Sequence, residues 1–108
     1  MKKLLILLLF TPFVLLSQNT KKAKKAFVKA VEFYEESNFK KSKELVQLAI
    51  RKDANFLPCY LLMGQLEEEG GNIELAIENY LKGISDNNPD NAWGYWKVGM
   101  LYLSLIHI

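Results

Sequence analysis

The chain has 108 residues, of which 50% are hydrophobic and 24% charged, a composition typical of a globular domain rather than of a disordered or collagen-like chain. One Cys and one His exclude a disulfide framework and a zinc site built from several such ligands. The formal charge of +2 falls to zero without Lys2 and Lys3, so we expect no nucleic-acid partner.

Residues 1–17 have the pattern of a secretory signal peptide. Lys2 and Lys3 form a positive head, Leu4–Leu16 is an apolar run, and Ser17 is a small residue at its exit. The alternative is a transmembrane anchor, but a span needs about 20 apolar residues, more than this run provides. We therefore expect cleavage after Ser17, no stable membrane span in the mature chain, and a periplasmic or outer-membrane-associated protein.

Beyond residue 20 the chain repeats itself at a fixed sequence offset. The size-matched pairs at this offset are Ala30 and Gly64, Asn38 and Asn72, Phe39 and Ile73, Ser42 and Ala76, Val46 and Tyr80, and Ala49 and Gly83. A third, partial copy follows at an offset that is longer by one, with the pairs Tyr60 and Tyr95, Met63 and Val98, and Gly64 and Gly99. The repeat period, 34 residues from Ala30 to Gly64, is typical of stacked supersecondary units.

The spacing of apolar residues predicts an all-α fold. The expected helices cover residues 20–36, 40–52, 57–69, 73–85 and 91–103. Asn38 and Asn72 precede the second and fourth of these, and we expect their side chains to accept hydrogen bonds from the free amides at the helix starts. Pro89 is expected to lie between helices.

The repeated residues resemble those of the tetratricopeptide repeat (TPR). The patterns that carry the resemblance are Tyr60-x-x-Met63-Gly64, Tyr95-x-x-Val98-Gly99-x-x-Tyr102, and Ala76-x-x-x-Tyr80 followed by Pro89. The resemblance implies a right-handed α-solenoid of antiparallel helix hairpins over residues 20–102. It implies about two and a half TPR units, at 22–56, 57–88 and, in part, 89–102. Glu67 departs from the family pattern, which usually has an aromatic residue there.

In this family the first helix of each repeat lines a concave surface, so the resemblance also implies a protein-binding groove. Its implied lining residues are Phe27, Val31, Tyr34 and Glu35 from the first repeat, Leu61, Gln65, Glu68 and Glu69 from the second, and Trp96 and Met100 from the third. An apolar trough with an acidic margin fits a peptide segment or a partner helix. In the alternative interpretation, Phe27, Leu61 and Trp96 pack between repeats instead.

We expect no enzyme activity and no metal or cofactor in this chain. His107 is the only His, so a Ser-His-Asp or Cys-His arrangement has no other imidazole as its base. Cys59 is either a thiol activated by a helix N-terminus or a small buried hydrophobe, and we expect the second.

Charge is divided unevenly along the chain. Residues 20–52 carry ten Lys and Arg against four Asp and Glu, whereas residues 53–108 carry two against eight. This asymmetry favours either stacking or self-association of the oppositely charged parts, or attraction of the lysine-rich start to an anionic envelope surface. A solvated lysine-rich helix start is the third interpretation.

The expected function is that of a non-catalytic protein–protein interaction scaffold of the cell envelope. Alternatives are a structural or anchoring envelope protein with a peptidoglycan-binding domain beyond this sequence, or an enzyme or signalling protein with a downstream catalytic domain. Both alternatives place a further domain after this sequence, in agreement with our expectation that the chain is an N-terminal fragment. Residues 103–108 are expected to be non-native, because Leu-Ser-Leu-Ile-His-Ile resembles the translation of a transposon-end adapter used in preparing sequencing libraries.

Overall fold

The computed structural model describes residues 2–84 and 91–106. Within these ranges it contains five helices and no strand, namely α1 (Lys2–Glu35), α2 (Phe39–Lys52), α3 (Pro58–Glu69), α4 (Ile73–Gly83) and α5 (Asn91–Ile106). The all-α prediction is therefore confirmed for the described residues. Pro89 and His107, on which two expectations rest, lie outside them.

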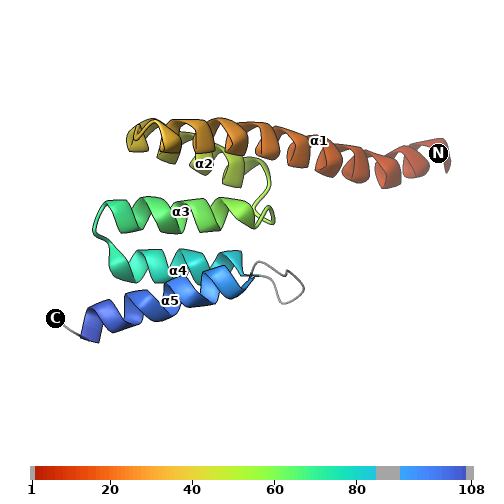
Figure 1. Ribbon diagram of the computed structural model, residues 1–108. Coiled ribbons are helices and arrows are strands. Elements are labelled where there is room, and N and C mark those ends of the chain that lie inside the picture. Colours follow the sequence, from red (N-terminus) through yellow and green to blue (C-terminus); the bar gives the residue numbers. More distant parts are fainter. Residues whose placement is uncertain (1, 85–90, 107–108) are drawn as a thin grey trace.

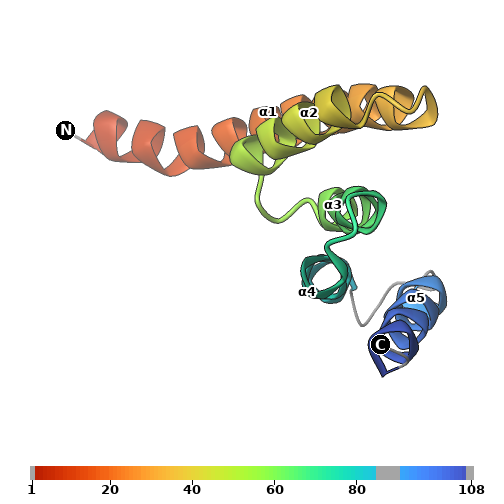
Figure 2. The same cartoon turned by 90° about the vertical axis from the view of Figure 1, so that its left-hand side faces the viewer.

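The main difference from the predicted helices is the start of α1, which begins at Lys2 rather than near residue 20. Its first half is rich in Leu, a strong helix former, so the backbone continues as helix through the apolar run. This half extends beyond α2 and away from the other helices (Figures 1 and 2). In the described part of the chain, no helix has the length and apolarity that crossing a membrane requires. Cleavage after Ser17 stays a prediction.

The helices are arranged as successive neighbours in chain order. α1 packs against α2, α2 against α3, α3 against α4 and α4 against α5. α1, α3 and α5 run in one direction and α2 and α4 in the opposite one (Figure 1). The views of Figures 1 and 2 agree that α5 lies farthest from α1. This packing, in which each element contacts mainly its neighbours, is consistent with a helical repeat.

Two hydrophobic clusters follow each other along the stack. The first joins α1, α2 and α3, and its fully buried members are Ala23, Ala30, Val46, Ala49 and Cys59. The second joins α4 and α5 through Tyr80, Ile77, Val98 and Leu101, and Leu61 of α3 packs against it. Helix α3 thus contributes to both clusters and connects the two hairpins.

The two turns that close the hairpins have the same backbone geometry at equivalent positions of the repeat. In each turn the amide of the final Asn, Asn38 or Asn72, donates to the carbonyl five residues earlier at 2.8 Å. The residue before it has a positive φ, 62° at Ser37 and 79° at Gly71. The φ and ψ angles are −89° and 74° at Asn38, and −90° and 74° at Asn72. The sequence repeat is therefore also a repeat of local structure.

The two capping asparagines differ in what their side chains do. Asn38 accepts a hydrogen bond from the amide of Lys41 at 3.3 Å, as predicted. The same prediction is wrong for Asn72, whose amide group instead donates to Glu67 at 2.8 Å. Glu67 is buried and also pairs with Lys43 at 3.0 Å. A buried carboxylate needs several partners, and this need outweighs the gain from a helix cap.

Candidate functional site

A groove of about 400 Å³ lies between α1 and α3, with α5 at one side. Its lining residues are Phe27, Val31, Tyr34 and Glu35 of α1, Pro58, Leu61, Leu62 and Gln65 of α3, and Trp93 of α5. Six of the ten residues implied by the family resemblance are therefore together here: Phe27, Val31, Tyr34, Glu35, Leu61 and Gln65. They come from equivalent faces of two helices, because Phe27 and Leu61, and likewise Val31 and Gln65, are separated by one repeat period.

The apolar floor of the groove is fixed by packing behind it. Phe27 is partly buried against the first hydrophobic cluster, and its ring contacts Phe56 edge-to-face with centroids 5.5 Å apart. Leu61 is partly buried against the second cluster. Both residues therefore pack on a hydrophobic cluster and also line the groove.

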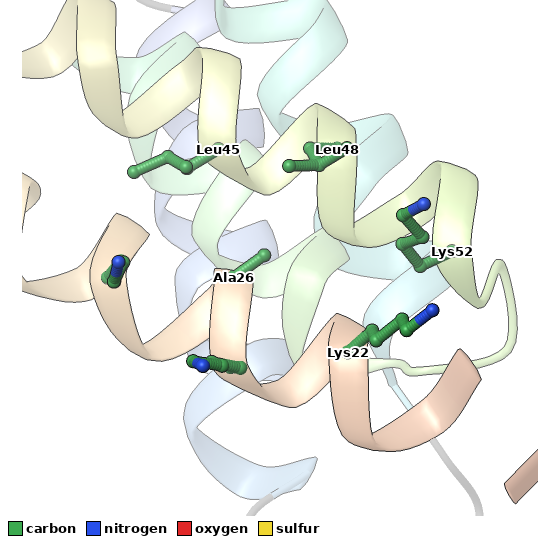
Figure 3. A pocket seen from close by; sticks show the side chains of 7 residues that line it. Lys22, Ala26, Leu45, Leu48 and Lys52 are labelled. Carbon is green, nitrogen blue, oxygen red and sulfur yellow. The ribbon is translucent and has the colours of Figure 1, made fainter. Parts of the chain in front are cut away.

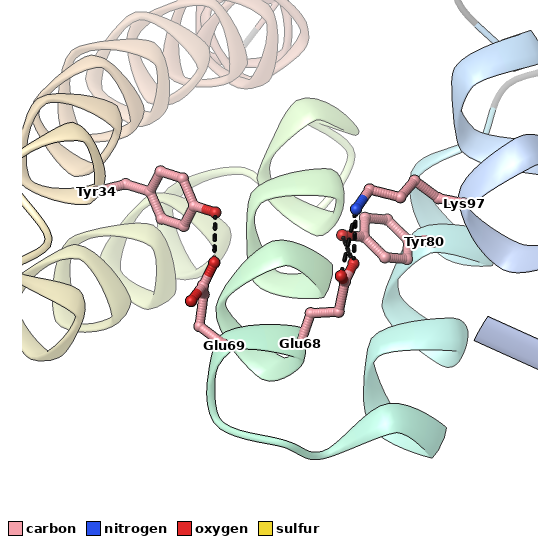
Figure 4. Close-up of polar contacts among 5 residues, drawn as sticks. All are labelled: Tyr34, Glu68, Glu69, Tyr80 and Lys97. Carbon is pink, nitrogen blue, oxygen red and sulfur yellow. Dashed lines mark hydrogen bonds and ion pairs between the residues drawn. The ribbon is translucent and has the colours of Figure 1, made fainter. Parts of the chain in front are cut away.

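Tyr34, one of the lining residues, makes a polar contact between the two hairpins. The Tyr34 hydroxyl donates to Oε1 of Glu69 at 3.3 Å (Figure 4). Burial and the neighbouring Glu69 carboxylate raise the pKa of Tyr34 above its usual value, so its hydroxyl keeps its proton. The Tyr34 ring packs against Phe39, with centroids 5.3 Å apart. Glu35 lines the groove and Glu69 is bonded to the lining residue Tyr34, so acidic groups lie next to the apolar lining.

Glu68 has a different position from the one the resemblance implies, because its carboxylate connects three helices. Oε1 of Glu68 accepts a hydrogen bond from the Tyr80 hydroxyl of α4 at 2.7 Å. The Lys97 ammonium of α5 lies 3.1 Å from the same oxygen and 3.2 Å from Oε2 (Figure 4). Burial and the Glu68 carboxylate raise the pKa of Tyr80. Glu68 is therefore half-buried in a contact that holds the stack, and it does not line the groove.

Trp96 and Met100 lie outside the groove, and both are exposed on α5. In their place α5 contributes Trp93, which we did not include among the candidates. Trp93 packs edge-to-face on Tyr80 with centroids 5.6 Å apart. Two sequence signals point to Trp93. It lies one helical turn before Trp96, and its position in the third copy of the repeat is equivalent to that of Pro58, another lining residue, in the second copy.

A second hollow, of about 250 Å³, lies between α1 and α2 on the lysine-rich part of the chain. Ala26, Leu45 and Leu48 form its apolar floor, while its margin is basic and consists of Lys22, Lys25, Lys29 and Lys52 (Figure 3). The charge asymmetry of the sequence therefore appears as a basic-rimmed surface on the first hairpin. This surface would attract an anionic group by charge alone.

Among the residues that the structure describes, no three His, Cys, Asp or Glu side chains lie close enough together to hold a metal ion. Cys59 is fully buried, and burial together with the nearby Asp53 raises the pKa of its thiol to about 11. The thiol is therefore protonated at neutral pH, and its position fits the expected buried hydrophobe.

Comparison with protein-family models, with curated proteins and with solved structures finds no match to this chain.

Proposed function

We propose that this chain is a non-catalytic protein-interaction module of the TPR type, and that the groove between α1 and α3 holds a peptide segment or a helix of another protein. The observation that carries the proposal is the groove itself, because side chains separated by one repeat period in sequence line one hollow. In this proposal the hairpins follow the right-handed solenoid path that the TPR resemblance implies. The module acts in the cell envelope, after removal of residues 1–17.

The groove is suited to recognition because its walls are already in place. α1 and α3 are held by a common hydrophobic cluster and by the contact between Tyr34 and Glu69. A preformed site spares the partner the cost of ordering the protein as it binds. The aromatic residues Phe27, Tyr34 and Trp93 provide the kind of anchor that commonly dominates protein interfaces.

The chemistry of the lining indicates which peptides bind. The floor is apolar, so it accepts an aliphatic or aromatic side chain, whose burial contributes about 1.5–3 kcal/mol. Glu35 lines the groove and Glu69 is exposed beside Tyr34, so the margin favours Lys or Arg next to the apolar anchor. The proposed ligand is therefore a short segment with both apolar and basic residues.

A displayed library of random twelve-residue peptides, selected on the purified chain, tests this proposal. We expect the selected peptides to combine an apolar anchor with Lys or Arg. Binding should be lost in Gln65→Arg, which places a bulky cation in the groove, because Gln65 is half-buried at its lining. Gln47→Arg is the matched control, since Gln47 is exposed on α2 and does not line the groove.

The selection can also contradict the proposal. Peptides that bind Gln65→Arg as tightly as the unmodified chain would show that recognition takes place elsewhere. Enrichment of acidic peptides, with binding lost in Lys25→Glu, would assign recognition to the basic-rimmed hollow of the first hairpin instead.

A further inference from the structure

The basic-rimmed hollow of the first hairpin has cations at its margin and no acidic residue in its lining. Lys22 of α1 and Lys52 of α2 extend toward the same end of the hollow (Figure 3). Within the described part of the chain, ion pairs are made by Lys43 and Lys97, and by none of the four lysines of the hollow. Their charges are therefore unbalanced, which favours an anionic occupant.

On α1 the basic surface is wider than the hollow. Lys21 and Lys24 are exposed, as are the three lysines of this helix that line the hollow. At about 100° per residue, these five lysines spread over about 160° of the helix circumference. Val28 lies among them and is 47% exposed. The result is a broad cationic surface with an apolar side chain inside it.

On α2 the same surface continues into a neighbouring hollow of about 340 Å³. The two hollows share Leu45 and Leu48, which are half-buried. The second hollow adds Lys41 and Arg51, with Glu44 as the acidic residue of its lining. An apolar strip with cations on its margins thus runs along the α1–α2 hairpin.

The corresponding surface of the second hairpin is apolar and covered. The residues one repeat period after Lys22, Lys25 and Lys29 are Phe56, Cys59 and Met63. Cys59 is fully buried, and the other two pack against the first hydrophobic cluster. A further hairpin packed on the first one in the same way would bury ammonium groups in place of apolar side chains, at a large cost in free energy. The exchange of apolar residues for lysine therefore indicates an occupant with negative charge.

We propose that this surface of the first hairpin, here called the basic face, docks on a lipid bilayer with anionic headgroups. The basic face consists of Lys21, Lys22, Lys24, Lys25, Val28 and Lys29 of α1 and Lys41, Leu45, Leu48, Arg51 and Lys52 of α2.

The breadth of the basic face favours a bilayer over a single small anion. Long, flexible lysines dominate it, and they match a plane of phosphate groups without needing one fixed geometry. Their aliphatic stems lie along apolar surface while the ammonium groups reach the headgroups. Lys25 and Phe27 are two residues apart and so point to nearly opposite sides of α1, which leaves the groove between α1 and α3 free. The inference is independent of that groove.

Flotation with large unilamellar vesicles measures the binding. The chain that begins at Gln18 is used, because the apolar run before it would bind lipid by itself. Its buried core is intact, since the buried residues of the first cluster begin at Ala23. We expect binding to phosphatidylcholine vesicles that contain about one third phosphatidylglycerol, and none to pure phosphatidylcholine. Binding should weaken as salt rises beyond about 0.15 M, where the screening length is about 8 Å.

A pair of double variants locates the surface. Each lysine at an anionic bilayer contributes about fivefold to binding, so Lys25→Glu/Lys29→Glu should weaken it at least about 25-fold. Lys40→Glu/Lys82→Glu is the matched control, because it changes the net charge equally at exposed positions outside the basic face. The control should bind within about threefold of the unmodified chain, since charges away from the contact are screened. Circular dichroism should show the same helical content for both variants.

Tryptophan fluorescence reports which side of the molecule meets the lipid. The two tryptophans of the chain, Trp93 and Trp96, are both on α5, the helix farthest from α1 (Figures 1 and 2). Vesicles with brominated acyl chains quench a tryptophan that reaches them. We expect the chain to bind these vesicles without quenching.

Four results would overturn the proposal: equal binding to neutral vesicles, no binding to anionic ones, equal loss in both double variants, or quenched tryptophan, which would place α5 on the bilayer. Soluble poly-glutamate tests the competing occupant. If it binds where vesicles do not, and Lys25→Glu/Lys29→Glu abolishes that binding, the basic face belongs to an acidic protein instead. Gln65→Arg should bind anionic vesicles like the unmodified chain, so failure of the groove and failure of the basic face are seen separately.

Discussion

Two glycines at equivalent positions should respond to the same substitution with opposite sign. Gly64 lies under the ring of Tyr80, and a Cβ there would be 2.6, 2.7 and 2.9 Å from three ring atoms. Tyr80 is fully buried, its hydroxyl is held by Glu68, and its ring packs against Trp93, so it has little freedom to move away. Overpacking of this kind costs about 1–3 kcal/mol.

The expected change in the free energy of unfolding combines this overpacking cost with the gain in helix propensity that alanine brings. In a helix interior, Gly→Ala is favourable by about 0.8–1.0 kcal/mol. For Gly64→Ala the contact distances put the overpacking cost near the upper limit, so we expect a net loss of about 2 kcal/mol. For Gly99→Ala only the propensity gain remains, because nothing lies within 4 Å of the added carbon among the described residues. We expect a gain of about 1 kcal/mol there.

Thermal unfolding followed by circular dichroism measures both variants under the same conditions. For a domain of this size 1 kcal/mol corresponds to about 4–8 °C in Tm, so the two variants should differ by well over 10 °C. Urea unfolding with an unchanged m value would show that the folded state is affected rather than the unfolded chain. An equal rise in Tm for both variants would refute the packing of Gly64 against Tyr80.

Three further predictions concern the polar contacts and the first turn. Tyr80→Phe removes the hydroxyl that donates to Glu68, and urea unfolding should show a loss of about 1.5–3 kcal/mol, as for other hydrogen bonds to charged groups. Ser37→Gly should raise the free energy of unfolding by about 0.5–1 kcal/mol, because Ser37 is exposed with φ at 62°; an unchanged urea midpoint would contradict this strain. Burial raises the pKa of Glu67, but the hydrogen bonds from Asn72 and Lys43 outweigh it, so the net pKa lies below the usual 4.5. The stabilisation from Glu67 is therefore present above about pH 4.5 and lost as the pH falls through its folded pKa, and urea midpoints should decline less steeply on acidification in Glu67→Gln.

Much of the candidate site follows from the TPR resemblance together with the periodicity of the helices. Residues that share a helical face recur at i, i+3 and i+4, and a repeat of one helix hairpin brings equivalent faces side by side. The TPR resemblance, in which the first helices of the repeats line one concave surface, implied that Phe27, Val31 and Tyr34 lie beside Leu61 and Gln65, and the structure brings all five into one groove. It could not place Glu68, because a sequence pattern does not show which of two polar neighbours a carboxylate will bind.

The sequence by itself determined the helices, the turns between them and the period of the repeat, because these depend on local propensity and on the periodicity of apolar residues. Tertiary structure decided which polar groups pair. The side chain of Asn72 bonds to Glu67 instead of to the amides at the helix start, and the Glu68 carboxylate bonds to both Tyr80 and Lys97. It also decided which face of α5 is buried. These outcomes depend on competition among partners that are distant in sequence, and burial strengthens the electrostatic contacts that win.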